Sequence, residues 1–198
     1  MYLIKQDFES IISLDNLDRL TNSNDRVWQA AEKVALEEMK SYMRHRYDVA
    51  YEFRGIVLHD GALSYLEGDR VYIDDGSVTT FYVALQDVPT NTLITDDIFW
   101  KEGDDRNQKL INICTIILLY ENYTRLNGND IPNWLAVRYD GNDPLQKGGA
   151  IGYLKNIQKG VVSLDLRLLE DVESGDTQSG NRIAYGSAED VKNRNFSI

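Results

Sequence analysis

Two stretches of the chain repeat apolar residues at helical spacing, and a segment with a different pattern separates them. In residues 24–47 the apolar positions recur three and four residues apart, which places them on one face of a helix. They are Trp28, Ala31, Ala35, Met39, Tyr42 and Met43. Residues 107–126 are rich in isoleucine and leucine and end at Asn127-Gly128, and this length and stop favour a helix over a buried strand. Asn24 is the expected N-cap of the first helix.

The intervening residues change to β-branched and aromatic runs separated by turn sequences. The turns are Glu67-Gly68-Asp69 and a stretch from Asp74 to Ser77, which combine the residue types that tight hairpins require. The runs are Ser64–Leu66, Arg70–Ile73, Thr79–Leu85 and Ile98–Trp100. The pattern predicts a small antiparallel sheet of about three strands, with Trp100 as a packing anchor.

Shorter elements are expected on either side of these three blocks. Residues 5–20 predict one or two short helices, and Pro132 suits the first turn of a helix that contains Trp134. Leu145–Lys159 reads as a further helix closed by Gly160, and the alternation in Val161–Leu169 predicts a strand. The composition of residues 173–198 is polar, so this segment cannot bury enough apolar surface to fold alone.

These patterns predict an α+β protein with a mainly helical core of about four to five helices. Residues 1–54 and 104–172 form the expected core, residues 55–103 a β-rich insert, and residues 173–198 an extended C-terminal arm. The arm carries scattered anchors that could order on a partner by strand addition or in a groove. We therefore name as candidate partner-binding residues Arg182, Ile183, Tyr185, Lys192, Arg194 and Phe196.

Charge and cysteine content narrow the possible partners. A formal net charge of −11 argues against groove-reading nucleic-acid binding, although it permits a ring through which DNA slides without sticking. Cys114 is the single cysteine, so a disulfide framework and cysteine zinc sites are excluded, and we expect a buried thiol. The apolar run 113–120 is too short to cross a bilayer. The N-terminus shows no secretion signal, so we expect synthesis in the cytoplasm.

No residue pattern predicts catalysis, a cofactor or a metal site. The acidic pairs Asp74-Asp75, Asp96-Asp97 and Asp104-Asp105 suit turns and helix caps, and none belongs to a calcium loop with alternating ligands. His45 suits a helix end and His59 a loop. Glycine loops for phosphates and nucleophile elbows are also missing. We expect no enzymatic activity.

Four segments, taken in order, resemble the head–tail connector proteins of tailed bacteriophages, also called adaptor or head-completion proteins. The first is a short N-terminal motif, Tyr2–Phe8. The second is a motif with Arg and Tyr, Ser41–Tyr47, at the end of a long helix. A second long apolar helix carries Tyr and Arg in its last turns, within Leu118–Arg125. A helix of the type Tyr153–Gly160 then leads directly into a strand. The likeness covers roughly residues 1–50 and 105–170, and the insert departs from it.

This resemblance implies a virion structural protein at the neck, between head and tail. Such proteins form homo-oligomeric rings, commonly twelvefold, beneath the portal protein, and extend the channel through which DNA passes as cargo. Other neck or tail proteins would be further partners, and no membrane is involved. By position, residues 181–198 correspond to the arm that docks on the portal or on a neighbouring subunit.

The insert also suggests an alternative function. It is similar to small aromatic-rich β modules related to carbohydrate-binding domains, and its aromatic residues could stack on sugars or fill the core of a small sheet. These are Tyr65, Tyr72, Tyr82 and Trp100. A glycan-binding module on a helical scaffold is therefore the second hypothesis, and an enzyme with an unrecognised site is the third.

Overall fold

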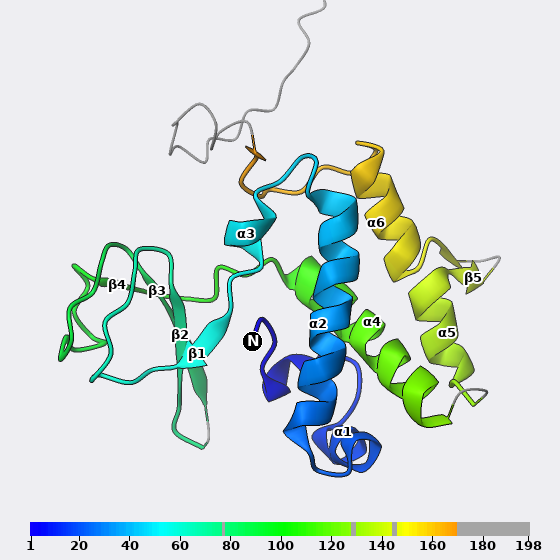
Figure 1. Cartoon of the computed structure of the whole chain (residues 1–198), viewed down its shortest axis with the longest axis horizontal. Coiled ribbons are helices and arrows are strands. Elements are labelled where there is room, and N and C mark those ends of the chain that lie inside the picture. Colours follow the sequence, from blue (N-terminus) through cyan, green and yellow to red (C-terminus); the bar gives the residue numbers. More distant parts are fainter. Residues whose placement is uncertain (77, 128–129, 144–145, 170–198) are drawn as a thin grey trace, which may run out of the picture.

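The helices gather on one side of the molecule and the main sheet on the other (Figure 1). The computed structural model describes residues 1–76, 78–127, 130–143 and 146–169. Its helical elements are η1 (Lys5–Ser10, a 3-10 helix), α1 (Leu14–Thr21), α2 (Asp25–Met43), α3 (Val49–Glu52), α4 (Gln108–Asn127), α5 (Asn133–Asp140) and α6 (Ala150–Gln158). Its strands are β1 (Ile56–Leu58), β2 (Arg70–Asp74), β3 (Thr79–Ala84), β4 (Trp100–Glu102), β5 (Asn142–Asp143) and β6 (Gln146–Lys147). The predicted α+β class is confirmed.

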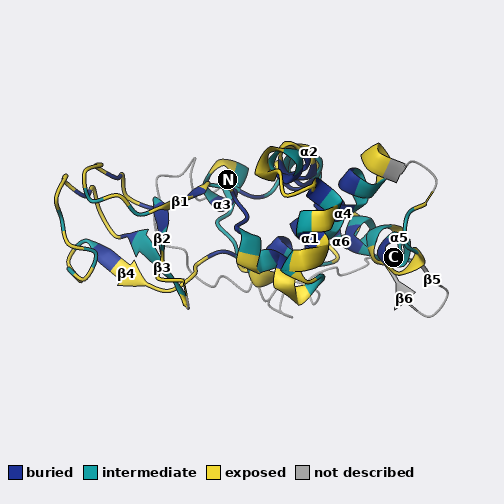
Figure 2. Ribbon diagram, turned by 90° about the horizontal axis from the view of Figure 1, so that it is seen from below, coloured by how far each residue is buried: buried dark blue, intermediate teal, exposed yellow. Residues whose placement is uncertain are grey.

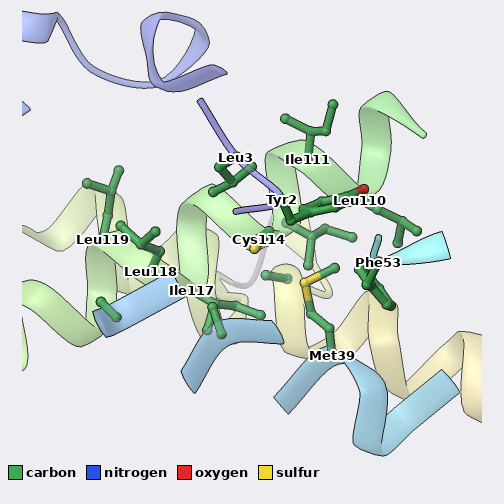
Figure 3. Packing of buried hydrophobic residues seen from close by; sticks show 14 of the residues in the cluster. Tyr2, Leu3, Met39, Phe53, Leu110, Ile111, Cys114, Ile117, Leu118 and Leu119 are labelled. Atoms are coloured by element: carbon green, nitrogen blue, oxygen red, sulfur yellow. The ribbon is translucent and has the colours of Figure 1, made fainter. Parts of the chain in front are cut away.

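Helices α2 and α4 form the centre of the helical core. The side chain of Asn24 accepts a hydrogen bond from the Arg26 N–H at 3.1 Å and caps α2 as predicted. Along α2, the apolar residues at helical spacing are buried, and they meet a continuous apolar stretch of α4 that includes Cys114 (Figure 3). Cys114 is fully buried and packs among Ile and Leu side chains, as a small hydrophobe does.

The N-terminal segment is threaded into this core. Tyr2, Leu3 and Phe8 are at most 1% exposed. Phe8 packs edge-to-face on Trp28 of α2 with ring centroids 5.5 Å apart, a favoured aromatic geometry. The N-terminal segment therefore contributes Tyr2, Leu3 and Phe8 to the core, and Phe8 ties η1 to α2.

The main sheet has the order β1-β2-β3-β4 and is mixed. Strands β2, β3 and β4 are antiparallel, as predicted, and β1 adds a parallel pair in which Ile56 lies opposite Arg70. Ser64–Leu66 is no strand, since Tyr65 makes only an isolated bridge to Val88. Trp100 is 3% exposed, so the prediction of a packing anchor is confirmed. It anchors a small cluster with Tyr65, Val71, Ala84 and Val88.

The helix predicted from Leu145 to Lys159 is wrong for residues 146–149, because Gln146–Lys147 form β6 and α6 begins at Ala150. Strands β5 and β6 pair just before it. Gly141 and Gly148 have φ of +69° and +111°, a region that residues with a side chain rarely adopt. A Cβ on Gly141 would also clash with the backbone N of Gly149. The positive φ angles and this close approach keep the chain in a turn just before α6, where the sequence suggested a helix.

The strand predicted at Val161–Leu169 is also wrong, since the segment forms only an isolated bridge between Leu168 and Tyr47. A strand requires a partner strand, and residues 46–48 run alongside for a short distance only. The Leu169 N–H donates to the Arg46 carbonyl at 3.0 Å, and the Asp48 N–H donates to the Arg167 carbonyl at 2.9 Å. The alternation still has a structural role, because the apolar side chains pack against the helical core: Val162, Leu164, Leu166 and Leu168.

Replacing Trp28 with alanine should destabilise the protein by about 3–5 kcal/mol, because the side chain is 2% exposed and its removal leaves a cavity beside Phe8. Urea denaturation followed by far-UV circular dichroism measures this change. Trp134→Ala is the matched control, since Trp134 is 40% exposed, and it should cost about 1 kcal/mol or less. Equal losses for both variants would contradict the packing described.

Candidate functional site

The candidate partner-binding residues of the C-terminal arm lie outside the described residues. They are Arg182, Ile183, Tyr185, Lys192, Arg194 and Phe196. The prediction that this segment binds a partner stays a prediction, and the described surface must be considered by itself.

Side chains that could carry chemistry are dispersed in the described part of the chain. No group of three or more His, Cys, Asp or Glu could hold a metal ion there. Burial raises the pKa of the Cys114 thiol, which disfavours the reactive thiolate. His45 is exposed in the turn after α2, and His59 stacks on Tyr65 at 5.8 Å between ring centroids. These groups do not meet.

A buried arginine joins the N-terminal segment to the chain that follows the insert and to the sheet. The Arg106 guanidinium donates to Asp7 at 2.8 and 3.1 Å, to Asp104 at 2.8 and 2.9 Å, and to the Tyr2 carbonyl at 2.7 Å. Its side chain is fully buried, and its Cζ lies 5.1 Å from the ring centroid of Phe81 on β3. Burial lowers the pKa of Arg106, but the two carboxylates outweigh burial and raise it overall. The N-terminal segment, the start of α4 and the sheet thus share one charged group.

A second arginine links the sheet to α3. Arg70 on β2 is 2% exposed. It donates to both oxygens of Asp105 at 2.6 and 3.1 Å and to the Glu52 carbonyl at 2.9 Å. The Glu52 carboxylate in turn accepts the Arg167 N–H at 3.0 Å, and burial raises the pKa of this carboxyl group. Such bidentate pairs fix orientation as well as distance, so the insert is held to the helices at two charged points.

The N-terminus is held by a carboxylate of α2. Oε1 of Glu32 accepts the N–H groups of Tyr2 and Leu3 at 2.7 and 2.6 Å. Glu32 is 3% exposed, and burial raises its pKa although these two hydrogen bonds lower it. The Met1 carbonyl accepts the Ile56 N–H, so the same segment also contacts β1.

The aromatic residues proposed to bind sugars have different exposures. Tyr65 and Trp100 are 6% and 3% exposed and pack edge-to-face on each other at 5.3 Å. His59 covers Tyr65 and meets Trp100 edge-on at 5.7 Å. Tyr72 and Tyr82 are half-buried in the sheet. The buried pair fills the core of the insert, so neither ring is available to stack on a sugar in the described structure.

A groove of about 380 Å³ opens between η1, α4, α5 and α6, and we call it the α5–α6 groove. Its walls include the apolar Ile11, Ile113, Ile116, Val137, Ala150 and Tyr153. Lys109 and Arg138 supply positive charge, and the described residues that line it include no carboxylate. Lys109 Nζ lies 4.9 Å from the ring centroid of Tyr153. A second groove, of about 490 Å³, lies between α2 and the N-terminal segment and includes both Glu32 and Lys33.

The insert has the opposite electrostatic character. Residues 55–103 contain nine Asp and Glu against two Lys and Arg, and Arg70 is buried. Eight of the thirteen large hydrophobic side chains exposed in the described structure also lie there. They are Val57, Leu58, Leu63, Leu66, Val78, Leu85, Leu93 and Ile98. Much of the ribbon around the main sheet is exposed and is coloured yellow in Figure 2. Exposed apolar side chains rimmed by polar residues are typical of a surface that contacts protein.

Sequence reasoning missed the joint between insert and helices. Asp104 and Asp105 were expected to cap α4, but Asn107 does so by accepting the Lys109 and Leu110 N–H groups at 3.0 and 3.2 Å. The two aspartates instead pair with Arg106 and Arg70. The available signal was the run Asp104-Asp105-Arg106 between β4 and α4, because in a sequence such a run fits either a helix cap or a buried ion pair.

Comparisons with models of protein families, with curated proteins and with solved structures found no match. Within the described residues, the helices are too short or too polar to span a lipid bilayer.

Arg106→Ala should lower the free energy of unfolding by about 3–5 kcal/mol, because it leaves the largely buried Asp7 carboxylate without its partner. Lys5→Ala is the control. Lys5 pairs with Asp25 at 3.0 Å on the surface, where both side chains are 40% or more exposed, and such pairs contribute about 0–1 kcal/mol. Chemical denaturation distinguishes the two, and a loss below 1 kcal/mol for Arg106→Ala would contradict a structural role.

Glu32→Ala should destabilise the fold because two buried N–H groups lose their acceptor, at about 1–3 kcal/mol each. Glu32→Gln keeps an acceptor oxygen and should cost less. Because burial raises the pKa of Glu32, the folded state takes up a proton at a higher pH than the unfolded state. This group therefore adds stability as the pH falls toward 4.5, the ordinary value, and loses it as the pH rises.

Thermal denaturation of wild type and Glu32→Gln between neutral pH and pH 4.5 tests this linkage. Wild type should gain stability relative to the Gln variant as the pH falls, because glutamine has no proton to take up. A stability difference that is constant with pH would show that the Glu32 pKa is not raised.

Proposed function

We propose that the protein is a virion structural protein, a head–tail adaptor that forms a closed homo-oligomeric ring, of about twelve copies, below the portal of a tailed phage. It extends the DNA channel and joins head to tail, without enzymatic activity. The ring count comes from the family resemblance alone.

One observation carries this proposal: the four segments that resemble the connector family converge in one hydrophobic cluster. Tyr2, Leu3 and Phe8 come from the first segment and Tyr47 from the second. Leu118 and Leu119 come from the third, and Leu154 and Ile157 from the fourth. All of them are at most 1% exposed and belong to the helical core cluster. Motifs that meet in one core behave as a single structural unit, which supports a common origin better than their order alone.

The fourth segment departs from the family pattern. Helix α6 is followed by residues 161–169, which lie on the core without forming a regular strand. These residues are nevertheless held against the end of the second segment, because the Leu164 N–H donates to the buried Tyr47 hydroxyl at 3.0 Å. Tyr47 thus joins the end of the second segment to the chain that follows the fourth.

The charge of the chain is compatible with a DNA channel. With a net charge of −11, the surface repels phosphates, so DNA would pass as cargo without being held. Residues 173–198 would serve as the arm that docks on the portal, another neck or tail protein, or a neighbouring subunit.

Glycan binding by the insert remains the alternative function. Tyr65 and Trp100 would have to expose ring faces that the described structure buries against each other and against His59. Glycan binding would therefore need a rearrangement of the insert core, which makes it the weaker proposal. A glycan array probes it directly.

Electron microscopy of the protein mixed with its portal tests the proposed function. We expect rings stacked coaxially on the portal, because a contact that closes by rotation gives the ring one axis, which it would share with the portal. Protein that stays monomeric and fails to bind any neck component would contradict the proposal.

Deletion of residues 174–198 provides the matched variant in the same experiment. The deleted chain should keep its melting temperature, since a polar segment without a periodic apolar face adds little to a core. Its affinity for the portal should fall by about tenfold or more. A large loss of thermal stability would instead assign the segment to the core.

A further inference from the structure

The insert and helices α5 and α6 stand at opposite ends of the longest axis of the molecule (Figure 1). The groove combines apolar walls with Lys109 and Arg138 and has no carboxylate among its described lining residues. The insert combines exposed apolar side chains with a large excess of acidic residues. A head-to-tail contact between copies requires two complementary surfaces on opposite sides of the folded molecule.

One part of the insert presents both features together. The Glu67 N–H donates to Asp87 at 3.1 Å, and the Leu85 N–H donates to the Phe99 carbonyl at 2.8 Å. These bonds bring the loop after β1 against the loop between β3 and β4. We call this region the insert tip, and its exposed residues are Leu66, Glu67, Leu85, Asp87, Asp97 and Ile98. Leu66 and Ile98 are 66% and 65% exposed.

We propose that the insert tip of one copy docks in the α5–α6 groove of the next copy, and that this contact closes the adaptor ring. The proposal rests on the proposed function for the closure of the ring, but the contact itself is defined by these two surfaces. Leu66, Leu85 and Ile98 enter between the apolar walls, and Asp87 and Asp97 face Lys109 and Arg138. The groove volume of about 380 Å³ lies in the range of clefts that enclose small groups, about 300–1,000 Å³.

Charge and apolar surface together favour a second copy of the chain as the partner that fills the groove. A nucleic acid would match Lys109 and Arg138 but not the apolar walls between them. A second copy supplies acidic and apolar groups on the same tip, at the local concentration that a ring provides. Complementary charges of this kind speed association and reject a wrong orientation more than they add affinity. A heterologous contact that closes by rotation leaves every groove and every insert tip filled.

Thiol cross-linking measures the contact directly, because the single native thiol, Cys114, is buried. Ser10 lines the groove and Ile98 lies on the insert tip. Copies carrying Ser10→Cys, mixed with copies carrying Ile98→Cys, should be joined by a bismaleimide with a short flexible spacer. Ser41→Cys is the matched control, since Ser41 is also an exposed serine but lies on α2 away from the groove. Equal yields from both serine positions would overturn the proposal.

Charge reversal then tests specificity. Lys109→Glu with Arg138→Glu on the Ser10→Cys copy should lower the yield by about tenfold or more, and so should Asp87→Lys with Asp97→Lys on the Ile98→Cys copy. Mixing the two reversed copies should restore cross-linking, which also shows that both fold. Lys40→Glu with Arg44→Glu on α2 should change nothing. Yields that are insensitive to both reversals overturn the proposal.

The outcomes separate this contact from the proposed function. If charge-reversed copies form rings on the portal as efficiently as wild type does, the proposed adaptor function stands and the proposed contact is overturned. Charge-dependent cross-linking without any affinity for a portal would retain the contact and overturn the adaptor. Cross-linking that survives reversal of the insert but is lost on deletion of residues 174–198 would assign the groove to the C-terminal segment and overturn the proposal.

Discussion

The buried guanidinium of Arg106 holds the joint between the helical core and the insert. It is the point at which the N-terminal segment, the first residues after the insert and the sheet are joined, through Asp7, Asp104 and the Tyr2 carbonyl. A buried cation requires this many partners, because an unpaired charge in the interior is far more costly than the bonds it loses. These hydrogen-bond partners lie outside the insert, but the Phe81 ring on β3 covers the guanidinium, so separating the insert from the helices would expose the charge.

This joint gives the molecule two hydrophobic clusters with a polar boundary. The helical cluster is built around α2 and α4, and the smaller one lies beneath Trp100. Arg70, with Asp105 and Glu52, reinforces the boundary. A fixed boundary matters for assembly, since a tip on a rigid insert can reach a groove on a neighbour without a further loss of conformational entropy.

The periodic elements were predictable because local pattern and tertiary packing agree in them. The stripe of α2, its Asn24 cap and the role of Trp100 follow from residue spacing and turn chemistry. The errors occur where a local pattern was overruled. Leu145–Lys159 was expected to be one helix, but Gln146–Lys147 pair as a strand, and Gly149 approaches Gly141 closely just before α6 begins at Ala150. Val161–Leu169 alternates like a strand, yet no neighbouring strand among the described residues is available to pair with it. The candidate residues of the C-terminal arm lie outside the described part of the chain.

The sequence by itself determined the α+β class, the two long helices, the buried thiol and the acidic character of the chain. Each of these depends on composition or on spacing within one segment. Tertiary structure alone decided that Asp104 and Asp105 pair with arginines rather than cap a helix, that β1 joins the sheet in parallel, and that Lys109 and Arg138 line one groove. Ion pairs and grooves are formed by residues up to about a hundred positions apart, such as Asp7 and Arg106. Only the packed chain determines which of many possible partners lies within bonding distance.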